Sequence, residues 1–342
     1  MMIWLVSYTA RGRALAARAA DILQKEGHGC RTFALPKCAQ GGDEPLTLSA
    51  PEWAKEGFSR ADALIFCCAA GIAVRAVAPH VRDKRTDPAV LVMDEKGTFV
   101  VPLLSGHLGG ANALALDLAA KLPATPVLTT ATDVNGLFAV DVFAKANDLY
   151  IEDMTLAKAV SAALLAGEAV GFCSDLPVTG ALPQELTAGD ADLGVYVTAG
   201  TGAPFPRTMR LIPRRYAVGI GCRRGKDEAE LEAFLRENLA LWGVGLRELR
   251  ALATIDLKKD EPGLLALAQK LSLPLLTYSA EELKAVPGDF TPSAFVREIT
   301  GVDSVCERAA ALSSGGTLIV RKTARDGMTF ALEKKEEAIR FE

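Results

Sequence analysis

The strongest constraint on the fold is an alternation of short apolar runs with a helical repeat, which begins at the N-terminus. Ile3–Ser7 and Cys30–Leu35 have the length and composition of buried strands. Between them, the apolar residues from Leu15 to Leu23 follow the pattern i, i+4, i+7 and i+8, which places them on one face of a helix. Gly27 ends this helix. Strand–helix–strand units of this kind assemble into mainly parallel sheets with flanking helices, so the sequence predicts an α/β fold.

The same pattern continues and predicts a first α/β domain over residues 1–136. The stretch Pro36–Pro51 contains Gly and Pro and is expected to be a loop. Further strands are expected at Ala63–Ala69, Ala89–Met93, Phe99–Leu104 and Val127–Thr130. A helix is expected at Ala111–Leu122. Ligands of such sheets bind beyond the carboxyl ends of the strands, so the turns after the strands are the candidate binding segments.

A small α/β middle domain with a linker is expected over residues 137–213. Leu156–Ala166 is rich in alanine and predicts a helix, and Ala169–Cys173 predicts a strand. Gly200–Pro206 has the composition of a linker. A chain of 342 residues is long enough for two or three domains, so the fold is expected to be multidomain.

A third α/β domain is expected over residues 214–342. Asp227 with Glu230 forms a capping-box pattern, and the apolar face of the helix that follows runs from Leu231 to Trp242. Strands are expected at Tyr216–Ile220, Ala251–Ile255 and Leu273–Tyr278. A closing hairpin is expected over Thr317–Leu332.

Composition excludes several classes of function. The net charge of −4 gives no basic surface for nucleic acid. The chain has no apolar run near the ~20 residues of a membrane span, and Met1–Ser7 lacks the basic start of a signal peptide. Its seven cysteines form no Cys-x-x-Cys pair, so we expect a reducing cytoplasm and no zinc site. With only three histidines we expect no transition-metal centre built by the protein; a metal would arrive within the substrate. No cofactor is expected.

The segment Leu103–Asn112 is the strongest candidate for chemistry. It follows a strand, opens a helix and contains three glycines, which let backbone N–H groups approach an anion. His107 lies within it and can move a proton near neutral pH. The alternative is a tight turn with a polar cap. If the segment is functional, its substrate-binding residues are Ser105, Gly106, Gly109, Gly110 and Asn112.

Two further segments of the first domain could contribute to the same site. Gly71 follows a buried strand, and Arg75 and Lys84 belong to a basic stretch that suits a substrate with several carboxylates. The alternative is a solvated basic loop. Thr130 ends the last expected strand of this domain and Asp133 follows it. Both could position a substrate or a water molecule, or form local hydrogen bonds to the backbone.

The third domain has a glycine-rich turn of its own. Its candidate binding residues are Gly219, Gly221, Cys222, Arg223 and, after the next strand, Lys258. The turn is similar to a dinucleotide loop, but its last glycine comes one position late, so an anion-binding turn is the better interpretation. A plain charged loop is the alternative around Lys258.

Together these segments resemble the cobalamin biosynthesis protein CbiG family, the cobalt-precorrin-5A hydrolases of the anaerobic pathway. The third domain also resembles CobE, a stand-alone protein of the aerobic route. The match covers the first and third domains well and the middle domain poorly. The motifs that carry it are Gly71–Arg75, Asp87–Val90, Leu103–Asn112, Pro126–Asp133, Val218–Gly225, Thr254–Glu261, Ser304–Ala310, Lys322 and Thr329–Leu332.

The resemblance implies a reaction and a substrate. A cobalt-bearing macrocycle carries a lactone between C20 and the ring-A acetate; water opens the lactone, and C20 leaves with its methyl group as acetaldehyde. The cobalt is held by the macrocycle, and other enzymes of the pathway are possible partners. The rival readings are a corrinoid carrier without activity and a nucleotide-dependent oxidoreductase or methyltransferase.

The chemistry of the residues suggests how the reaction would be catalysed. We expect His107 to be the general base, with Asp133 in reserve, and the N–H groups of Gly109 and Gly110 to bind the oxyanion. The substrate is expected in a cleft between the first and third domains. If the turns at Gly71 and Gly106 share one site, both must lie at the same end of the sheet.

Overall fold

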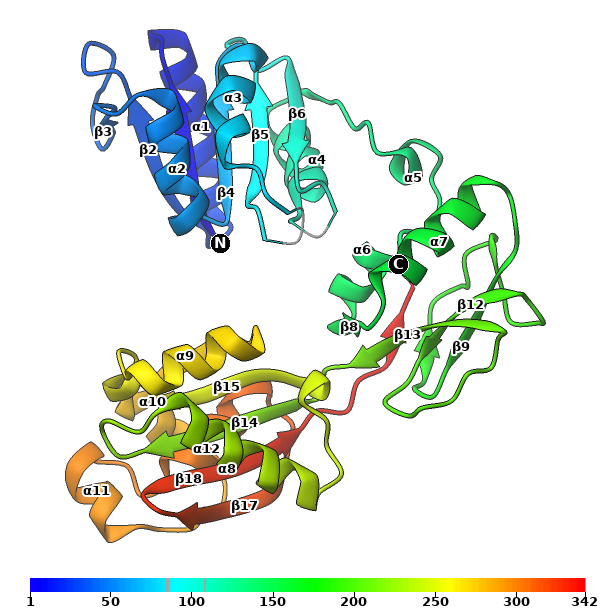
Figure 1. Ribbon diagram of the computed structural model, residues 1–342. Coiled ribbons are helices and arrows are strands. Elements are labelled where there is room, and N and C mark those ends of the chain that lie inside the picture. The colour runs from blue at the N-terminus through cyan, green and yellow to red at the C-terminus, as the bar shows by residue number, and fades with distance from the viewer. Residues whose placement is uncertain (84–85, 108, 342) are drawn as a thin grey trace. The chain divides into compact units, whose positions relative to one another are not determined.

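The chain folds into two compact units in the computed structural model, which describes residues 1–83, 86–107 and 109–341 (Figure 1). The first unit is Met1–Val142, and the second extends from Phe143 to the C-terminal end. Each of the three larger sheets is mainly parallel or mixed, with helices packed against it. The expected multidomain α/β class is confirmed.

A seven-stranded sheet forms the centre of the first unit. Its strands, in spatial order, are β3 (Glu44–Pro45), β2 (Gly29–Ala34), β1 (Met2–Ser7), β4 (Ala63–Cys67), β5 (Ala89–Met93), β6 (Phe99–Leu104) and β7 (Thr125–Pro126). All neighbouring pairs are parallel except β5 with β6. The helices of the unit are α1 (Ala10–Lys25), α2 (Ala50–Arg60), α3 (Ala70–Val77), η1 (Ala78–His80), α4 (Ala111–Lys121), α5 (Ala131–Val134) and the start of α6 (Val140–Ala146).

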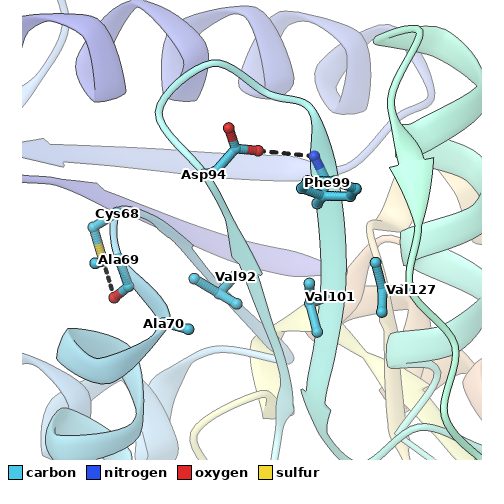
Figure 2. A pocket seen from close by; sticks show the side chains of 8 residues that line it. All are labelled: Cys68, Ala69, Ala70, Val92, Asp94, Phe99, Val101 and Val127. Atoms are coloured by element: carbon cyan, nitrogen blue, oxygen red, sulfur yellow. Dashed lines mark hydrogen bonds between the residues drawn. The ribbon is translucent and has the colours of Figure 1, made fainter.

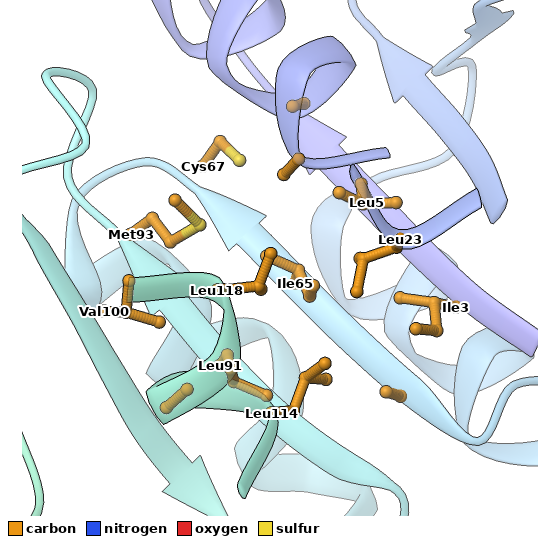
Figure 3. Packing of buried hydrophobic residues seen from close by; sticks show 14 of the residues in the cluster. Ile3, Leu5, Leu23, Ile65, Cys67, Leu91, Met93, Val100, Leu114 and Leu118 are labelled. Carbon is orange, nitrogen blue, oxygen red and sulfur yellow. The ribbon is translucent and has the colours of Figure 1, made fainter. Parts of the chain in front are cut away.

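Both faces of this sheet are buried, which explains its unbroken apolar strands. Ile3 and Leu5 of β1 pack with Leu23 of α1 and Leu118 of α4 on one face, as Figure 3 shows. Trp4 of β1 packs on the other face, against residues of α2 and α3. The alternation of side chains along each strand therefore supplies two separate cores.

Two expectations for the first domain are corrected. Val127–Thr130 is no strand: β7 ends at Pro126, and Thr130 caps the short helix α5. The helix α2 was not expected, although Ser49 and Glu52 form a capping box at its start. Pro51 suggested a loop, but proline suits the first turn of a helix because its missing N–H has no partner there.

The second unit begins with a five-stranded sheet. Its order is β11 (Leu186–Thr187), β9 (Val170–Ser174), β12 (Leu193–Val197), β13 (Arg207–Pro213) and β8 (Leu149–Ile151), with α7 (Met154–Leu165) packed on it. Gly200–Pro206 joins β12 to β13, which pair in this sheet, so the expectation of a linker there is wrong. Near the C-terminus, β19 (Ile339–Arg340) pairs with β10 (Val178–Thr179), which ties the end of the chain to this part.

A second five-stranded sheet follows, with parallel and antiparallel pairs. Its order is β16 (Leu275–Tyr278), β15 (Leu249–Ile255), β14 (Tyr216–Cys222), β18 (Met328–Lys334) and β17 (Thr317–Arg325). Its helices are α8 (Glu228–Leu241), η2 (Leu246–Glu248), η3 (Asp256–Lys258), α9 (Pro262–Leu271), α10 (Ala280–Ala285), α11 (Ala294–Thr300) and α12 (Val305–Ser314). The expected hairpin is confirmed as β17–β18. Trp242, expected on the buried face of α8, ends that helix and is 54% exposed. The expected boundaries of the three domains stay predictions.

Candidate active site

The glycine-rich loop around His107 connects β6 to α4, and its glycines allow two close approaches. A Cβ atom at Gly106 would lie 2.7 Å from Oδ1 of Asn112, and one at Gly109 would lie 2.7 Å from the carbonyl oxygen of Ser105. Gly110, with a φ of +85°, precedes α4 as its N-cap. A side chain at these positions would clash or strain the backbone, so the loop geometry requires glycine.

The imidazole ring of His107 lies between two carboxylates. Its Nε2 is 2.9 Å from Oδ2 of Asp133, and its Nδ1 is 3.3 Å from Oδ2 of Asp141. The hydroxyl oxygen of Thr132 is 3.5 Å from Nε2. The side chain of His107 is 14% exposed and that of Asp133 24%, so the cluster is enclosed and still accessible to water.

Asn112 connects this cluster to the next segment of the chain. Its Nδ2 donates to Oδ2 of Asp133 at 2.6 Å and to Oγ1 of Thr130 at 3.0 Å. Asn112 is buried in the first turn of α4, and Thr130 is the N-cap of α5. Four residues singled out from the sequence thus meet in one place, and they come from the loop, α4 and α5.

The two carboxylates decide the charge of the ring. The hydrogen bond to Asp141 contributes most to raising the pKa of His107, to about 9; burial opposes it, and Asp133 adds to it. Burial would raise the pKa of Asp141, but its hydrogen bond and charge pairing with His107 lower it overall. At neutral pH the ring is therefore an imidazolium whose two N–H groups face carboxylates.

Gly71 and Gly106 lie at opposite ends of the sheet, so the expectation that they share a site is wrong. β6 runs antiparallel to β5, and Leu104 at its end pairs with Val90 near the start of β5. Gly71 instead follows the carboxyl end of β4, whose Cys67 pairs with the last residue of β5. The sequence held a signal for this reversal: the connection over residues 94–98 is too short for a parallel crossover.

Other residues expected at the site have structural partners. The hydroxyl of Ser105 donates to the carbonyl oxygen of Asp87 at 2.9 Å. The N–H of Gly110 donates to the carbonyl oxygen of His107 at 2.9 Å, so it is not free to bind an oxyanion as expected. The guanidinium of Arg75 donates to the carbonyl oxygen of Gly71 within α3. Lys84 lies outside the described residues.

The sheet end that carries Gly71 also has an open apolar pocket of about 380 Å³ (Figure 2). Cys68 and Val92 line it together with Phe99, which is 46% exposed. Asp94 also lines it, but its carboxylate accepts hydrogen bonds from backbone N–H groups of the turn it begins, including that of Phe99. The pocket therefore offers apolar surface and no free catalytic group among its described lining residues.

The first part of the expected turn of the third domain is not a turn, because β14 extends to Cys222 and contains Gly219 and Gly221. Both glycines are needed for packing. A Cβ atom at Gly219 would overlap the carbonyl oxygen of Cys306 in α12. One at Gly221 would lie 2.6 Å from Oγ1 of Thr329 in β18. These glycines allow α12 and β18 to approach β14 closely. Packing alone therefore explains why glycine occupies both positions, without a bound ligand.

The remaining candidates in the third domain surround an internal ion pair. Nζ of Lys258 is 2.8 Å from Oε2 of Glu261, and Oε1 of Glu261 accepts the N–H of Gly225 at 2.8 Å. Burial raises the pKa of the Cys222 thiol, and the nearby Lys258 lowers it by a smaller amount. Arg223 is exposed. The N–H of Gly225 at the end of this turn thus donates to a carboxylate of the same chain, and binding of an external anion there stays a prediction.

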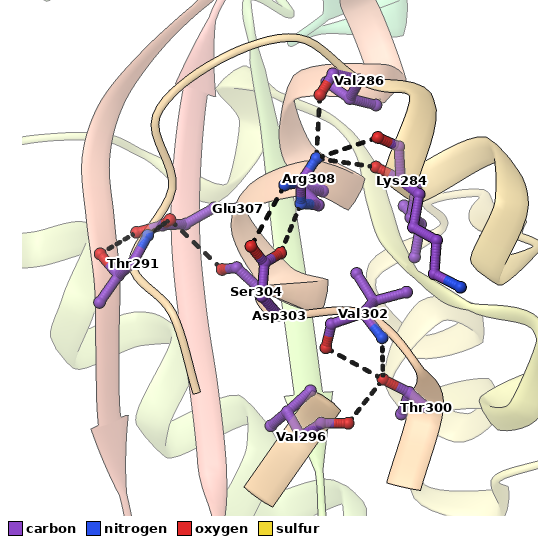
Figure 4. Close-up of polar contacts among 11 residues, drawn as sticks. Lys284, Val286, Thr291, Val296, Thr300, Val302, Asp303, Ser304, Glu307 and Arg308 are labelled. Atoms are coloured by element: carbon purple, nitrogen blue, oxygen red, sulfur yellow. Dashed lines mark hydrogen bonds and ion pairs between the residues drawn. The ribbon is translucent and has the colours of Figure 1, made fainter. Parts of the chain in front are cut away.

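The segment Ser304–Ala310, part of the family resemblance, organises the fold of the third domain (Figure 4). The buried carboxylate of Glu307 accepts from the backbone N–H groups of Thr291 and Lys322 and from the hydroxyls of Thr291 and Ser304. Arg308 donates to Asp303 and to the backbone carbonyls before it, among them that of Val286. These contacts hold the long connection between α10 and α12.

Two residues of the observed clusters were missed from the sequence. Asp141 lies in a region of weak pattern, 34 residues after His107, and nothing in its neighbours suggests that it returns to the loop. Glu261 follows an expected strand in a run of charged residues, which is typical of a solvent-exposed loop, yet it is buried. Both cases depend on tertiary contacts that local spacing does not reveal.

Models of one protein family match the chain in three consecutive segments. They are described as Cobalamin synthesis G N-terminal at residues 52–133, Cobalamin biosynthesis central region at 138–213 and Cobalamin synthesis G C-terminus at 216–333. The cobalt-precorrin-5A hydrolase of Salmonella typhimurium is 37% identical over 344 residues, which cover 96% of this chain and 97% of that protein. The chain belongs to the CbiG family.

Two other relatives are consistent with membership of the CbiG family. The cobalt-precorrin-5A hydrolase of Priestia megaterium is 34% identical over 293 residues, with 79% of this chain and 78% of that protein covered. The protein CobE of a Sinorhizobium species is 36% identical over 118 residues, with 34% of this chain and 77% of that protein covered. The resemblance to both CbiG and CobE is confirmed.

Two findings concern what this CbiG chain lacks in its described part. None of its described helices is both long and apolar enough to cross a membrane. Within the same residues, no group of three or more His, Cys, Asp and Glu side chains could hold a metal ion.

Proposed function

We propose that the chain hydrolyses cobalt-precorrin-5A, opening its lactone and releasing acetaldehyde, and that the cluster of His107 and Asp133 carries out this chemistry. Membership of the CbiG family and the names of the two hydrolase relatives support the substrate. The observation that carries the assignment of the site is the hydrogen bond between His107 and Asp133 beside a glycine-rich loop. A neighbouring acid and base of this kind can act on one bound group, which supports the proposal.

The charge of the cluster favours different roles from those expected from the sequence, where His107 was the general base and Asp133 its reserve. An imidazolium is an acid, and the Nε2 N–H of His107 donates to Asp133 in the structure without substrate. When the lactone oxygen binds beside Nε2, this N–H passes its proton to that oxygen. Asp133 accepts the proton of the attacking water. The water oxygen bonds to the lactone carbonyl carbon, and the bond between that carbon and the ring oxygen breaks. The ring oxygen stays on C20 and takes the proton from His107, so the products are a carboxylate and a C20 hydroxyl.

Acetaldehyde release follows from the same product. The C20 hydroxyl loses its proton to a base, the bond between C20 and the macrocycle breaks, and the electron pair of that bond passes to the conjugated macrocycle. C20 and its methyl group leave as acetaldehyde. The cobalt belongs to the substrate in this scheme, and no cofactor of the protein takes part.

The experiment that tests this function uses the whole chain and purified cobalt-precorrin-5A. Acetaldehyde is trapped as its hydrazone and counted against the macrocycle consumed. The proposal expects one acetaldehyde for each macrocycle, with more turnovers than enzyme molecules. Binding of the macrocycle without acetaldehyde would contradict the proposal and indicate a carrier.

A further inference from the structure

Asp141 is the carboxylate that faces His107 from the side opposite to Asp133. It lies in the first turn of α6, its side chain is 15% exposed, and its Oδ2 is 3.3 Å from Nδ1 of His107. Its other oxygen accepts the backbone N–H of Val142 at 3.0 Å. The carboxylate is thus fixed by the start of its own helix and directed at the ring.

The charged and polar groups around His107 come from three helices. Asp133 and the hydroxyl of Thr132 come from α5, Asp141 from α6, and the amide of Asn112 reaches Asp133 from α4. Among these groups His107 is the only one that can carry positive charge, and both partners of its ring are acceptors. Each ring nitrogen lies beside a carboxylate oxygen, which accepts hydrogen bonds. Both hydrogen bonds form only if both ring nitrogens carry a proton.

The two carboxylates are not equivalent. Asp133 is shared: its Oδ2 receives both Nε2 of His107 and Nδ2 of Asn112. Asp141 contacts only the ring and its own helix among the groups described above. Asp133 is also the more exposed of the two, at 24% against 15%, which suits Asp133 for proton exchange with the substrate and Asp141 for acting through His107.

We propose that Asp141 is a positioning residue that fixes the ring of His107, directs Nε2 towards Asp133 and keeps the ring a proton donor during hydrolysis. This role rests on the proposed function of the cluster. A carboxylate on the second nitrogen of a histidine orients the ring and stabilises its charged form, which is a recurrent device for setting the behaviour of the first nitrogen.

A titration by NMR tests the proposal without substrate. The chain has three histidines, so the ring signals of His107 can be identified in selectively labelled protein by their loss in H107Q. In the native chain the ring should titrate near pH 9. In Asp141→Asn the midpoint should fall by about one pH unit or more, since a charge partner is lost. Asp141→Glu keeps the negative charge, so its His107 midpoint should fall by less than half as much as that of Asp141→Asn.

A matched control removes a carboxylate of similar setting elsewhere in the unit. Asp43 pairs with Arg13 at 2.6 Å and accepts the hydroxyl of Thr32. Asp43→Asn should leave the His107 midpoint where it is in the native chain. If Asp141→Asn also leaves the midpoint unchanged while its ring signals show a folded protein, the positioning role is refuted.

The pH profile of acetaldehyde release is the second readout. A required imidazolium makes kcat/KM fall as the pH rises through the His107 midpoint, so the alkaline limb of Asp141→Asn should move to lower pH by the same amount as the NMR midpoint. A midpoint that moves while the alkaline limb does not would refute the role in hydrolysis. If H107Q is as active as the native chain, the proposed function of the cluster fails instead, and the NMR result still stands for the geometry.

Discussion

Nδ2 of Asn112 and Nε2 of His107 lie at 2.6 Å and 2.9 Å from the same oxygen of Asp133. One carboxylate oxygen therefore receives two donors, while the second oxygen has no hydrogen bond to a described residue among the contacts given above. The amide also reaches Thr130, which fixes the start of α5 and with it the position of Asp133. If Asp133 is the base, as we propose, Asn112 is the residue that orients it.

Replacing Asn112 by alanine should lower the kcat/KM of acetaldehyde release by about tenfold or more, because a misplaced catalytic group loses orientation. Steady-state kinetics on cobalt-precorrin-5A provide the measurement. Asn135→Ala is the matched control, since that amide contacts only the carbonyl oxygen of Ala131 on an exposed turn of α5 among the contacts described. Equal activity of the two variants would show that the amide does not position Asp133.

Local pattern was sufficient for the first β–α–β unit and for the loop at His107, because both depend on residues adjacent in sequence. The local pattern did not predict features that depend on contacts between segments distant in sequence. The antiparallel turn between β5 and β6 separates Gly71 from His107 by the length of the sheet. Asp141 joins the cluster through a fold that no periodicity shows.

The buried carboxylate of Glu307 should dominate the stability of the third domain. Removing its charge in Glu307→Gln leaves donors poorly satisfied, and hydrogen bonds to a charged group contribute about 1.5–3 kcal/mol. Urea unfolding should therefore show a loss of that order. Glu298→Gln, at an exposed position of α11, is the control and should unfold like the native chain. A Glu307→Gln variant of native stability would contradict the contacts observed.

The same carboxylate predicts a dependence of stability on pH. Burial raises the pKa of Glu307, but the backbone N–H groups of Lys322 and Thr291 outweigh it and lower the pKa below 4.5. Because the folded pKa is depressed, this stabilisation is present above the unfolded pKa and is lost as the pH falls through the folded one. The unfolding free energy of the native chain should thus fall more steeply below pH 4.5 than that of Glu307→Gln, measured by urea titration at each pH.

Gly219→Ala should destabilise the chain because the added methyl group would meet the carbonyl oxygen of Cys306. Overpacking of this kind costs about 1–3 kcal/mol. Gly245→Ala is a fair comparison, since a Cβ atom there first meets Oε1 of Glu248 at 3.4 Å. Thermal unfolding of both variants distinguishes them, and equal midpoints would mean that α12 can move away from β14 without penalty.

The carboxylate of Glu261 contacts the turn that follows β14, so its removal should free the donors of that turn. Glu261→Gln leaves the N–H of Gly225 and the ammonium of Lys258 available to a carboxylate of the macrocycle. Absorbance titration should show tighter binding, more so at low salt, where screening is weakest. Lys258→Ala should weaken binding. Unchanged affinity in both variants would show that the macrocycle does not use this turn.

The most direct test of the account compares His107→Gln with the native chain in single-turnover release of acetaldehyde at saturating cobalt-precorrin-5A. Glutamine keeps a hydrogen bond towards Asp133 but cannot transfer a proton. The rate should fall by about 10²–10⁴ while the macrocycle still binds, because general acid–base catalysis is lost. A rate within a few fold of the native one would contradict it, because His107 would then hold the loop in place without taking part in hydrolysis.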